Sequence, residues 1–423
     1  MIDARTLSYD FDEEAGDLGP ETRPSSGPGF GGGHAESQND GVFFGSMTAR
    51  GVAGWIAGLL LTAFYVVLYW WPQYLDAGVG LVDPLARGLS GQPADRWFLY
   101  GLLYTGAILV FGVRMLRKYR HVRYEQLRTL SVMFFQLGFA FLIPQILKAL
   151  NEPEYYFSYF WPLKPEYLQP WNVDYLLQHP GRLGVFMVVW GAVMSFVAVP
   201  LLTHRFGKRW YCSWVCGCGG LAETLGDQWR QLSSKSRLSW WIERVVIYGV
   251  LVLVVLTTAL LWINYSSGGS MFSSASGALA KWYGFYIGAL FSGVVGVGFY
   301  PILGSRVWCR FGCPMAAILG IFQKFFSRFR IRTNGGQCMS CGNCSTYCEM
   351  GIDVRAYAQR GENIVRASCV GCGICSAVCP RGVLQLSTDG SFGDRYPGSE
   401  RPLDALIATL ANAPKQGHYG TEE

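Results

Sequence analysis

Charged residues are scarce in this chain. Of its 423 residues, 15% are charged and 51% are hydrophobic, whereas soluble proteins carry about 25% charged residues. This composition excludes an ordinary soluble domain and indicates an integral membrane protein with a smaller soluble part. The formal net charge is +6. Because no nucleic-acid-binding motif accompanies that charge, nucleic acid is not an expected partner.

Histidine is also scarce, and the N-terminus lacks a leader pattern. None of the five histidines (His34, His121, His179, His204 and His418) lies inside an apolar stretch. A b-type haem embedded in a membrane usually takes its axial histidines from such stretches, so we expect no haem in the bundle. The first residues lack a basic start followed by an apolar run, so we expect no secretory signal peptide.

Six apolar stretches are long enough to cross a bilayer, which takes about 20 residues. They are residues 52–72, 97–116, 128–149, 182–203, 242–263 and 283–304. Gln136, Pro144 and Gln145 interrupt the third, and glycine is frequent in the sixth, which suits close helix packing. The sequence therefore predicts an α-helical bundle of about six spans within residues 49–330.

The distribution of lysine and arginine predicts the orientation of these spans. Both residues crowd the second loop, the fourth loop and the stretch after the sixth span, and they are few in the other loops. By the positive-inside rule both termini are expected in the cytoplasm, which suggests a bacterial inner membrane. Residues 1–48 and 391–423 are expected to be tails, the first of them acidic and disordered.

Cysteine is the most informative residue type that is present. Two neighbouring runs have the spacing C-x2-C-x2-C-x3-C, and they contain Cys338, Cys341, Cys344 and Cys348, then Cys369, Cys372, Cys375 and Cys379. Thiolates at this spacing hold [4Fe–4S] clusters, with the fourth ligand of each cluster taken from the other run. Residues 331–390 therefore read as a small α+β two-cluster ferredoxin domain of the bacterial type.

The expected ligand sets follow from that crossed arrangement. Cluster 1 takes Cys338, Cys341, Cys344 and Cys379, and cluster 2 takes Cys369, Cys372, Cys375 and Cys348. Two zinc sites are the simpler alternative, because C-x2-C also binds zinc, but two complete four-cysteine runs favour clusters. Pro380 follows the second run as expected, whereas Glu349 follows the first. We expect that change to alter the conformation of the loop or the reduction potential of the cluster without removing the cluster.

Four further cysteines form two C-x3-C pairs, Cys212 with Cys216 and Cys309 with Cys313. Together they could hold a third cluster, form a thiol–disulfide couple, or bind copper(I), which soft thiolates suit. They could also be buried structural thiols. Cys218 has no counterpart at the second pair, and its role as a ligand is left open.

The two C-x3-C pairs belong to a weak internal repeat. Arg209 and Arg306 each lie three residues before the first cysteine of their pair. In both copies an aromatic residue lies between the arginine and that cysteine, and an amphipathic stretch follows the pair. Each pair comes directly after an apolar span. Matching elements at the ends of two membrane helices can face each other across a pseudo-two-fold axis.

A site for a quinone would need polar groups at membrane depth. Gln136, Gln145, Lys148 and Arg182 are the candidates. Helix packing and snorkelling to the interface are the simpler explanation of the same side chains.

These motifs resemble the NapH/NosR/CcoG-type membrane-bound polyferredoxins over roughly residues 180–390. Members of that family exchange electrons with the quinone pool, assist nitrous oxide reductase or handle copper for oxidase assembly. Gly217 stands where the family has proline after the second cysteine of the pair, although Pro314 keeps the pattern. We expect neither the extracytoplasmic flavin domain of the nitrous-oxide-type members nor the C-terminal immunoglobulin-like domain of the copper-handling type.

The sequence thus predicts a membrane-bound iron–sulfur protein that relays electrons between the quinone pool and a partner redox protein. Two [4Fe–4S] clusters and an additional metal or iron–sulfur centre are its expected cofactors. It would be an electron-transfer component, and no catalytic residue is assigned. The alternatives are a copper-handling assembly factor for a respiratory enzyme and a redox anchor subunit of a larger membrane complex.

Overall fold

The computed structural model describes residues 51–388, so both predicted tails lie outside the described residues. Within that range, six helices are long and apolar enough to cross a membrane. They are Val52–Trp70, Arg96–Lys118, Arg123–Ala149, Leu183–Phe206, Arg237–Ser266 and Ser274–Val295. The number and order of the predicted apolar spans agree with these six helices.

The third, fourth and sixth of these helices contain wider, π-helical turns. The elements of the six helices are α3 (Val52–Trp70), α5 (Arg96–Lys118), α6 (Arg123–Leu137), η2 (Gly138–Leu142), α7 (Ile143–Ala149), α9 (Leu183–Val193), η4 (Met194–Ala198), α10 (Val199–Phe206), α13 (Arg237–Ser266), α14 (Ser273–Tyr283) and η6 (Gly284–Val295). Pro144 and Pro200 lie two residues after the ends of η2 and η4. Because proline lacks an N–H and clashes with the preceding turn, a π-turn before it lets the helix continue.

The sixth span begins and ends earlier than the predicted 283–304. Its helix covers Ser274–Val295, and a short helix, α15 (Tyr300–Leu303), follows after a turn. A Cβ atom at Gly298 would lie 2.6 Å from the Thr62 hydroxyl of α3, so this backbone packs against the first span. Close packing at the glycines, followed by Pro301, ends the helix before residue 304.

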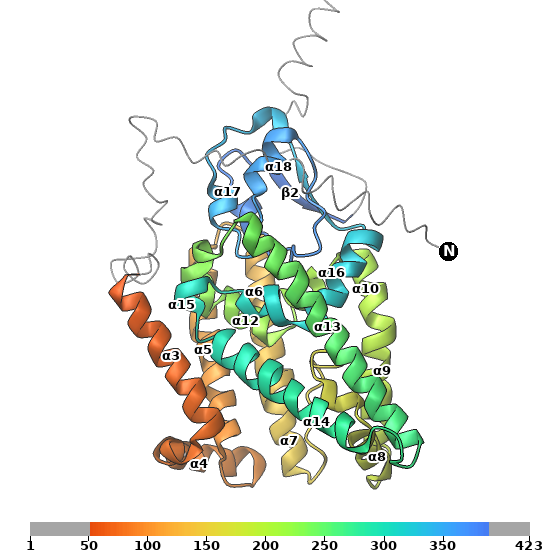
Figure 1. Ribbon diagram of the computed structural model, residues 1–423. Coiled ribbons are helices and arrows are strands. Elements are labelled where there is room, and N and C mark those ends of the chain that lie inside the picture. The colour runs from red at the N-terminus through yellow and green to blue at the C-terminus, as the bar shows by residue number, and fades with distance from the viewer. Residues whose placement is uncertain (1–50, 389–423) are drawn as a thin grey trace, which may run out of the picture. The chain divides into compact units, whose positions relative to one another are not determined.

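Shorter elements connect the spans at both ends of the bundle. The elements are η1 (Pro72–Leu75), α4 (Asp76–Ser90), η3 (Pro165–Leu168), α8 (Pro170–Gln178), α11 (Arg209–Cys212), α12 (Gly217–Glu223), η5 (Leu225–Leu232), η7 (Trp308–Gly312) and α16 (Pro314–Phe326). In Figure 1, α4 and α8 lie at the end of the bundle away from α17 (Asn343–Thr346), α18 (Val354–Arg360) and β2 (Leu384–Ser387).

The cysteine-rich segment after α16 mixes strands and short helices. Strands β1 (Arg330–Thr333) and β2 (Leu384–Ser387) pair antiparallel, with Arg330 opposite Ser387. Between them lie η8 (Gly335–Gln337), α17 (Asn343–Thr346), α18 (Val354–Arg360) and α19 (Ile374–Ala377). One hydrophobic core joins this segment to the bundle, since it includes Met315 and Leu319 of α16 together with Ile331 and Val370.

Candidate iron–sulfur site

The eight cysteines of the two ferredoxin runs line two separate cavities. Cys338, Cys341, Cys344 and Cys379 line the first, which we call the outer cavity. Cys348, Cys369, Cys372 and Cys375 line the second, which we call the inner cavity. Each cavity receives three cysteines from one run and the last cysteine of the other. These two groups have the same membership as the ligand sets expected from the spacing.

The backbone around the two cavities is built alike. Gly342 and Gly373 have positive φ angles of 82° and 91° and precede the short helices that carry the third cysteine of each run. The N–H of Ile352 donates to Cys348 Sγ, and the N–H of Val383 donates to Cys379 Sγ, both at 3.4 Å. N–H groups directed at sulfur stabilise a thiolate or a cluster sulfide, so the surroundings fit iron–sulfur clusters.

The two C-x3-C pairs share a local structure, although their sequences match weakly. The chain enters each pair through a glycine in the left-handed region, Gly207 (φ 71°) and Gly304 (φ 96°). The N–H of Cys216 then donates to the Tyr211 carbonyl at 2.8 Å. In the second copy, the N–H of Cys313 donates to the carbonyl of Trp308 at 2.9 Å. The same i to i−5 hydrogen bond therefore closes both turns.

The second cysteine of each pair also lies at the start of a helix. Cys216 precedes α12 and Cys313 precedes α16. The N–H of Ala316 donates to Cys313 Sγ at 3.4 Å, whereas no side-chain hydrogen bond caps α12 at Cys216. A helix N-terminus favours negative charge, so the Cys313 thiol lies where its hydrogen bond favours a thiolate.

The four cysteines of the two pairs lie in one hydrophobic core, each 5% exposed. Arg306 joins the pairs, because its Nη1 lies 3.6 Å from Cys309 Sγ and 3.2 Å from the Cys212 carbonyl. Burial raises the pKa of the Cys309 and Cys313 thiols. A hydrogen bond from Cys218 lowers the pKa of Cys216 to about 7, so Cys218 is a neighbour of this site.

These thiols are not gathered tightly enough for a single metal ion. Among residues 51–388, no group of three or more His, Cys, Asp or Glu side chains has the arrangement of a mononuclear site. Zinc holds its sulfur ligands at about 2.3 Å, which forces the sulfurs close together, whereas a cubane is a wider object.

A buried network of ion pairs lies between the inner cavity and the C-x3-C pairs, and the sequence did not reveal it. Glu349, 1% exposed, pairs with Arg230 and Arg306 at 3.0 Å each. Arg230 Nη1 also lies 3.8 Å from Cys372 Sγ. Side chains of both signs therefore link a cysteine of the inner cavity to Cys309 through Arg230, Glu349 and Arg306.

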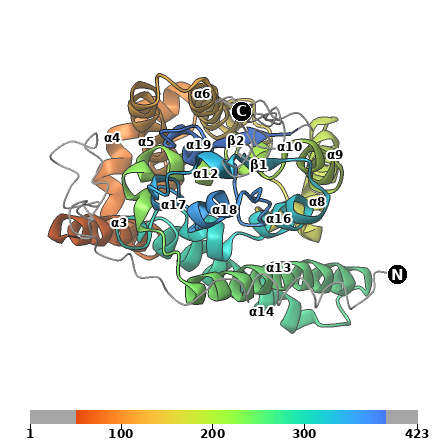
Figure 2. The same ribbon diagram turned by 90° about the horizontal axis from the view of Figure 1, so that it is seen from above.

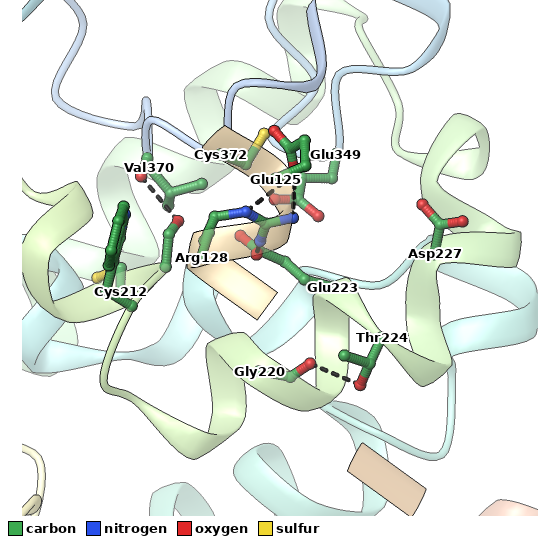
Figure 3. Close-up of polar contacts among 12 residues, drawn as sticks. Glu125, Arg128, Cys212, Gly220, Glu223, Thr224, Asp227, Glu349, Val370 and Cys372 are labelled. Atoms are coloured by element: carbon green, nitrogen blue, oxygen red, sulfur yellow. Dashed lines mark hydrogen bonds and ion pairs between the residues drawn. The ribbon is translucent and has the colours of Figure 1, made fainter. Parts of the chain in front are cut away.

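The same network extends through the bundle, as Figure 3 shows for several of its members. Its further pairs are Arg306 with Glu223, Arg128 with Glu223, Arg128 with Glu125, Arg230 with Asp227, and Lys118 with Asp227. Four cations and four anions thus compensate each other. Burial alone would raise the pKa of Glu349, but Arg230 and Arg306 hold it below its usual value.

The loop that carries Cys369 is bound to the bundle by hydrogen bonds. The Ser213 hydroxyl donates to the Val370 carbonyl at 2.9 Å, and the Tyr124 hydroxyl donates to the Gly371 carbonyl at 2.9 Å. Gln323 Nε2 donates to the Cys369 carbonyl at 2.7 Å, and Lys208 Nζ donates to the Ala367 carbonyl at 3.2 Å. The inner cavity therefore abuts the first C-x3-C pair, since Ser213 directly follows Cys212.

The two arginines matched in the repeat have different surroundings. Arg306 points inward, but the Arg209 guanidinium lies 4.7 Å from the centre of the Phe329 ring, and its Nε donates to the Phe206 carbonyl. Lys208, one residue earlier and 1% exposed, is the buried cation of the first copy. No carboxylate pairs with Lys208 in the described part of the chain.

Two of the polar side chains considered for a quinone have partners in the structure. Lys148 pairs with Glu154 at 2.8 Å, and Gln136 Nε2 donates to the Thr105 hydroxyl at 3.0 Å. Arg182 lies at the start of α9, and Gln145 is buried. Of these four side chains, Gln136 is the one with a fully shielded polar atom, Oε1, that has no partner.

Comparison with known families matches these segments. A 4Fe-4S dicluster domain matches residues 337–384. A 4Fe-4S binding domain matches twice, over residues 187–237 and 285–333. The second result confirms the internal repeat, because each match contains one C-x3-C pair. Both parts of the chain are therefore similar to iron–sulfur-binding domains, while the narrower NapH/NosR/CcoG assignment stays a prediction.

Two curated relatives are similar over part of their length. The Escherichia coli (strain K12) protein titled "Putative electron transport protein YccM" is 28% identical over 170 residues, 38% of this chain and 46% of the relative. The "Methylamine utilization ferredoxin-type protein MauN" of Methylobacillus flagellatus is 27% identical over 165 residues, 37% of this chain and 54% of the relative. The chain therefore spans about half the length of these relatives. No solved structure matches.

Proposed function

We propose that this protein holds three [4Fe–4S] clusters and relays electrons between the membrane quinone pool and a partner redox protein. Cluster 1 would be held in the outer cavity and cluster 2 in the inner cavity, with the ligand sets given above. Cys212, Cys216, Cys309 and Cys313 would hold the third cluster. When bound, each cluster supplies a carrier for one electron at a time.

The observation that carries this proposal is the set of contacts between the inner cavity and the C-x3-C pairs. Ser213, next to Cys212, donates to the carbonyl of Val370, next to Cys369. Electron transfer between buried centres falls steeply with distance, so direct backbone contact favours exchange between them. The protein excludes water from this junction, because Cys212, Cys309 and Cys369 are at most 7% exposed.

The residues around the junction also offset negative charge. Arg306 and Arg230 contact cysteine sulfurs directly, and Lys208 acts electrostatically on both Cys212 and Cys369. Four thiolates around a cluster bring net negative charge into a buried region, which is costly without compensation. Carboxylates already compensate the two arginines, so Lys208 is the cation left to offset this charge, and its position suits a reducible centre better than a pair of neutral structural thiols.

The outer cavity suits exchange with a partner. Cys341 is exposed, and the neighbouring Met339 is 58% exposed. An electron that reaches cluster 1 would therefore meet the surface of the protein. The names of the two relatives, an electron transport protein and a ferredoxin-type protein, are consistent with a role of this kind.

The proposal includes a location in the cell. The distribution of lysine and arginine favours a multi-pass protein of a bacterial inner membrane, with the ferredoxin domain of residues 331–390 on the cytoplasmic side. The six apolar helices support the membrane assignment.

Counting iron tests the number of centres. We expect about twelve iron atoms per chain in anaerobically purified protein, and about eight in a Cys309→Ala variant. EPR of the reduced state should lose one signal in that variant. Cys218→Ala is the matched control, which removes a neighbouring thiol and should leave the iron content unchanged. A wild-type content near eight would contradict the third cluster and favour thiol or copper chemistry at the C-x3-C pairs.

A further inference from the structure

Several tyrosines gather around Cys218 within the bundle. Tyr104 of α5 has the side chains of Tyr100, Tyr159, Tyr300 and Cys218 within electrostatic range. Cys218 belongs to α12, which packs against α5 and α6. Figures 1 and 2 both show these helices side by side. Cys218 lies two residues after Cys216, so the tyrosines around Cys218 lie next to the first C-x3-C pair.

Two polar atoms converge on the glycine between these cysteines. A Cβ atom at Gly217 would lie 2.4 Å from both Gln136 Oε1 and the Tyr159 hydroxyl. Gln136 is 4% exposed, and its Oε1 accepts no hydrogen bond. A buried carbonyl oxygen without a donor is costly, and each such group in a folded protein calls for an explanation.

Hydroxyl groups nearby also lack partners. Within residues 51–388, the hydroxyls of Tyr104 and Tyr159 make no hydrogen bond, and neither is among the fully shielded unsatisfied atoms. Both side chains keep part of their surface accessible although protein surrounds them. Protein therefore does not cover either side chain completely. Two potential donors and one acceptor are thus available to a bound molecule.

We propose that this tyrosine group binds the head ring of a quinone or quinol. Such a ring is flat and apolar on its faces and has oxygens at opposite edges. The Tyr104 and Tyr159 hydroxyls can donate to those oxygens, and Gln136 Oε1 can accept from a quinol hydroxyl. This inference rests on the proposed function, because the ligand class follows from an electron relay at a membrane.

The absence of formal charge in the group supports this ligand class. Tyr100, Tyr104, Tyr159 and Gln136 are neutral at ordinary pH, so they do not compensate an ion. Further aromatic rings adjoin the group, since Tyr100 lies 5.5 Å from Tyr104 and 5.9 Å from Tyr65 between ring centres. A neutral aromatic ligand fits such walls better than an anion or a metal ion.

Binding of a short-chain quinone to the whole protein tests the inference. Decylubiquinone would be titrated into the cluster-loaded protein in lipid nanodiscs, and its Kd measured. Tyr159→Phe and Tyr104→Phe keep the rings and remove one hydroxyl each, so each should weaken binding roughly 3- to 10-fold. Tyr175→Phe is the matched control, because Tyr175 lies on α8 and is 58% exposed.

The outcomes separate this inference from the relay itself. No measurable binding, or equal Kd values for the wild type and both hydroxyl variants, would overturn the site and leave its hydroxyls to ordered water. If the iron content were still about twelve, the three-cluster relay would stand with another membrane donor or acceptor. Weakened binding in both variants together with an iron content near eight would support the site and contradict the third cluster.

Discussion

The inner and outer cavities are built from the same motif but have different surroundings. Each has a glycine with positive φ before its third cysteine and an N–H donor at its borrowed cysteine. In the outer cavity Cys341 is exposed, whereas in the inner cavity Cys369 and Cys375 are buried. The loop of the inner cavity is held by side chains of the bundle, and Glu349 beside it joins a network of ion pairs. Two copies of one motif can thus differ in position, with one copy at the protein surface and the other packed against the membrane bundle.

Removing the buried carboxylate at the inner cavity should have the largest effect. Glu349→Ala leaves Arg230 and Arg306 without their shared partner, and breaking a buried pair costs about 3–5 kcal/mol. Glu362→Ala is the control near the outer cavity, because Glu362 is 51% exposed and pairs with Arg360 on the surface. That exposed pair should contribute less than about 1 kcal/mol. Chemical unfolding of both variants in the same detergent measures the difference, and equal losses would contradict the comparison.

The buried cation of the first repeat copy should affect the inner centre and not the outer one. Lys208→Met removes positive charge near Cys212 and Cys369, so reduction there becomes less favourable. The potentials of cluster 2 and the third cluster should fall by tens of millivolts, which is about 1–2 kcal/mol of charge interaction. Redox titration followed by EPR measures these shifts.

Two controls accompany that titration. Lys208→Arg keeps the charge and should restore the potentials, and Arg328→Met removes an exposed cation and should change little. A fall in the potential of cluster 1 as large as that of cluster 2 would show that Lys208 does not act locally.

The two cavities should also lose iron at different rates. Exposed Cys341 makes the outer cavity accessible to a chelator, while the bundle shields the inner one. When the oxidised protein is incubated with a chelator and samples are then reduced for EPR, we expect the signal of cluster 1 to decay several-fold faster than that of cluster 2. The Gln323→Ala variant, which loses the hydrogen bond to the Cys369 carbonyl, should narrow the gap. Equal rates in the wild type would contradict the shielding.

The smallest expected effect is a dependence of stability on pH. The pKa of Glu349 in the folded protein is below its usual 4.5, so its contribution is complete above pH 4.5 and is lost as the pH falls through the lowered pKa. The difference in unfolding free energy between the wild type and Glu349→Gln should therefore stay constant from pH 7 to about 5 and shrink in stronger acid. Acid damage to clusters is common to both proteins and cancels in the difference. If the difference in unfolding free energy between the two proteins grew in acid, the lowered pKa of Glu349 would be contradicted.

Local patterns accounted for much of this molecule. Cysteine spacing gave the two groups that line the cavities, because each run is a short segment that wraps its own site. Apolar length gave the six helices, since crossing a bilayer sets a minimum length for each. The glycine-rich sixth span was misplaced by about nine residues, because hydropathy does not register where backbones touch.

The ion-pair network had no such local signal. Glu223, Arg306 and Glu349 come from three distant segments, and each alone looks like a charge in a loop. The different roles of Lys208 and Arg209 were equally hidden, because the sequence suggested a match between Arg209 and Arg306. The replacement of proline by Glu349 after the first run was visible as a departure, but its partners emerge only in the folded chain.

The buried loop of the inner cavity also imposes an order in time. Gln323, Ser213 and Tyr124 hold the loop at Cys369 against the bundle. We therefore expect cluster 2 to be inserted before these hydrogen bonds form, while the loop is still free to move. Cluster 1 carries no such condition, because Cys341 of the outer cavity is exposed.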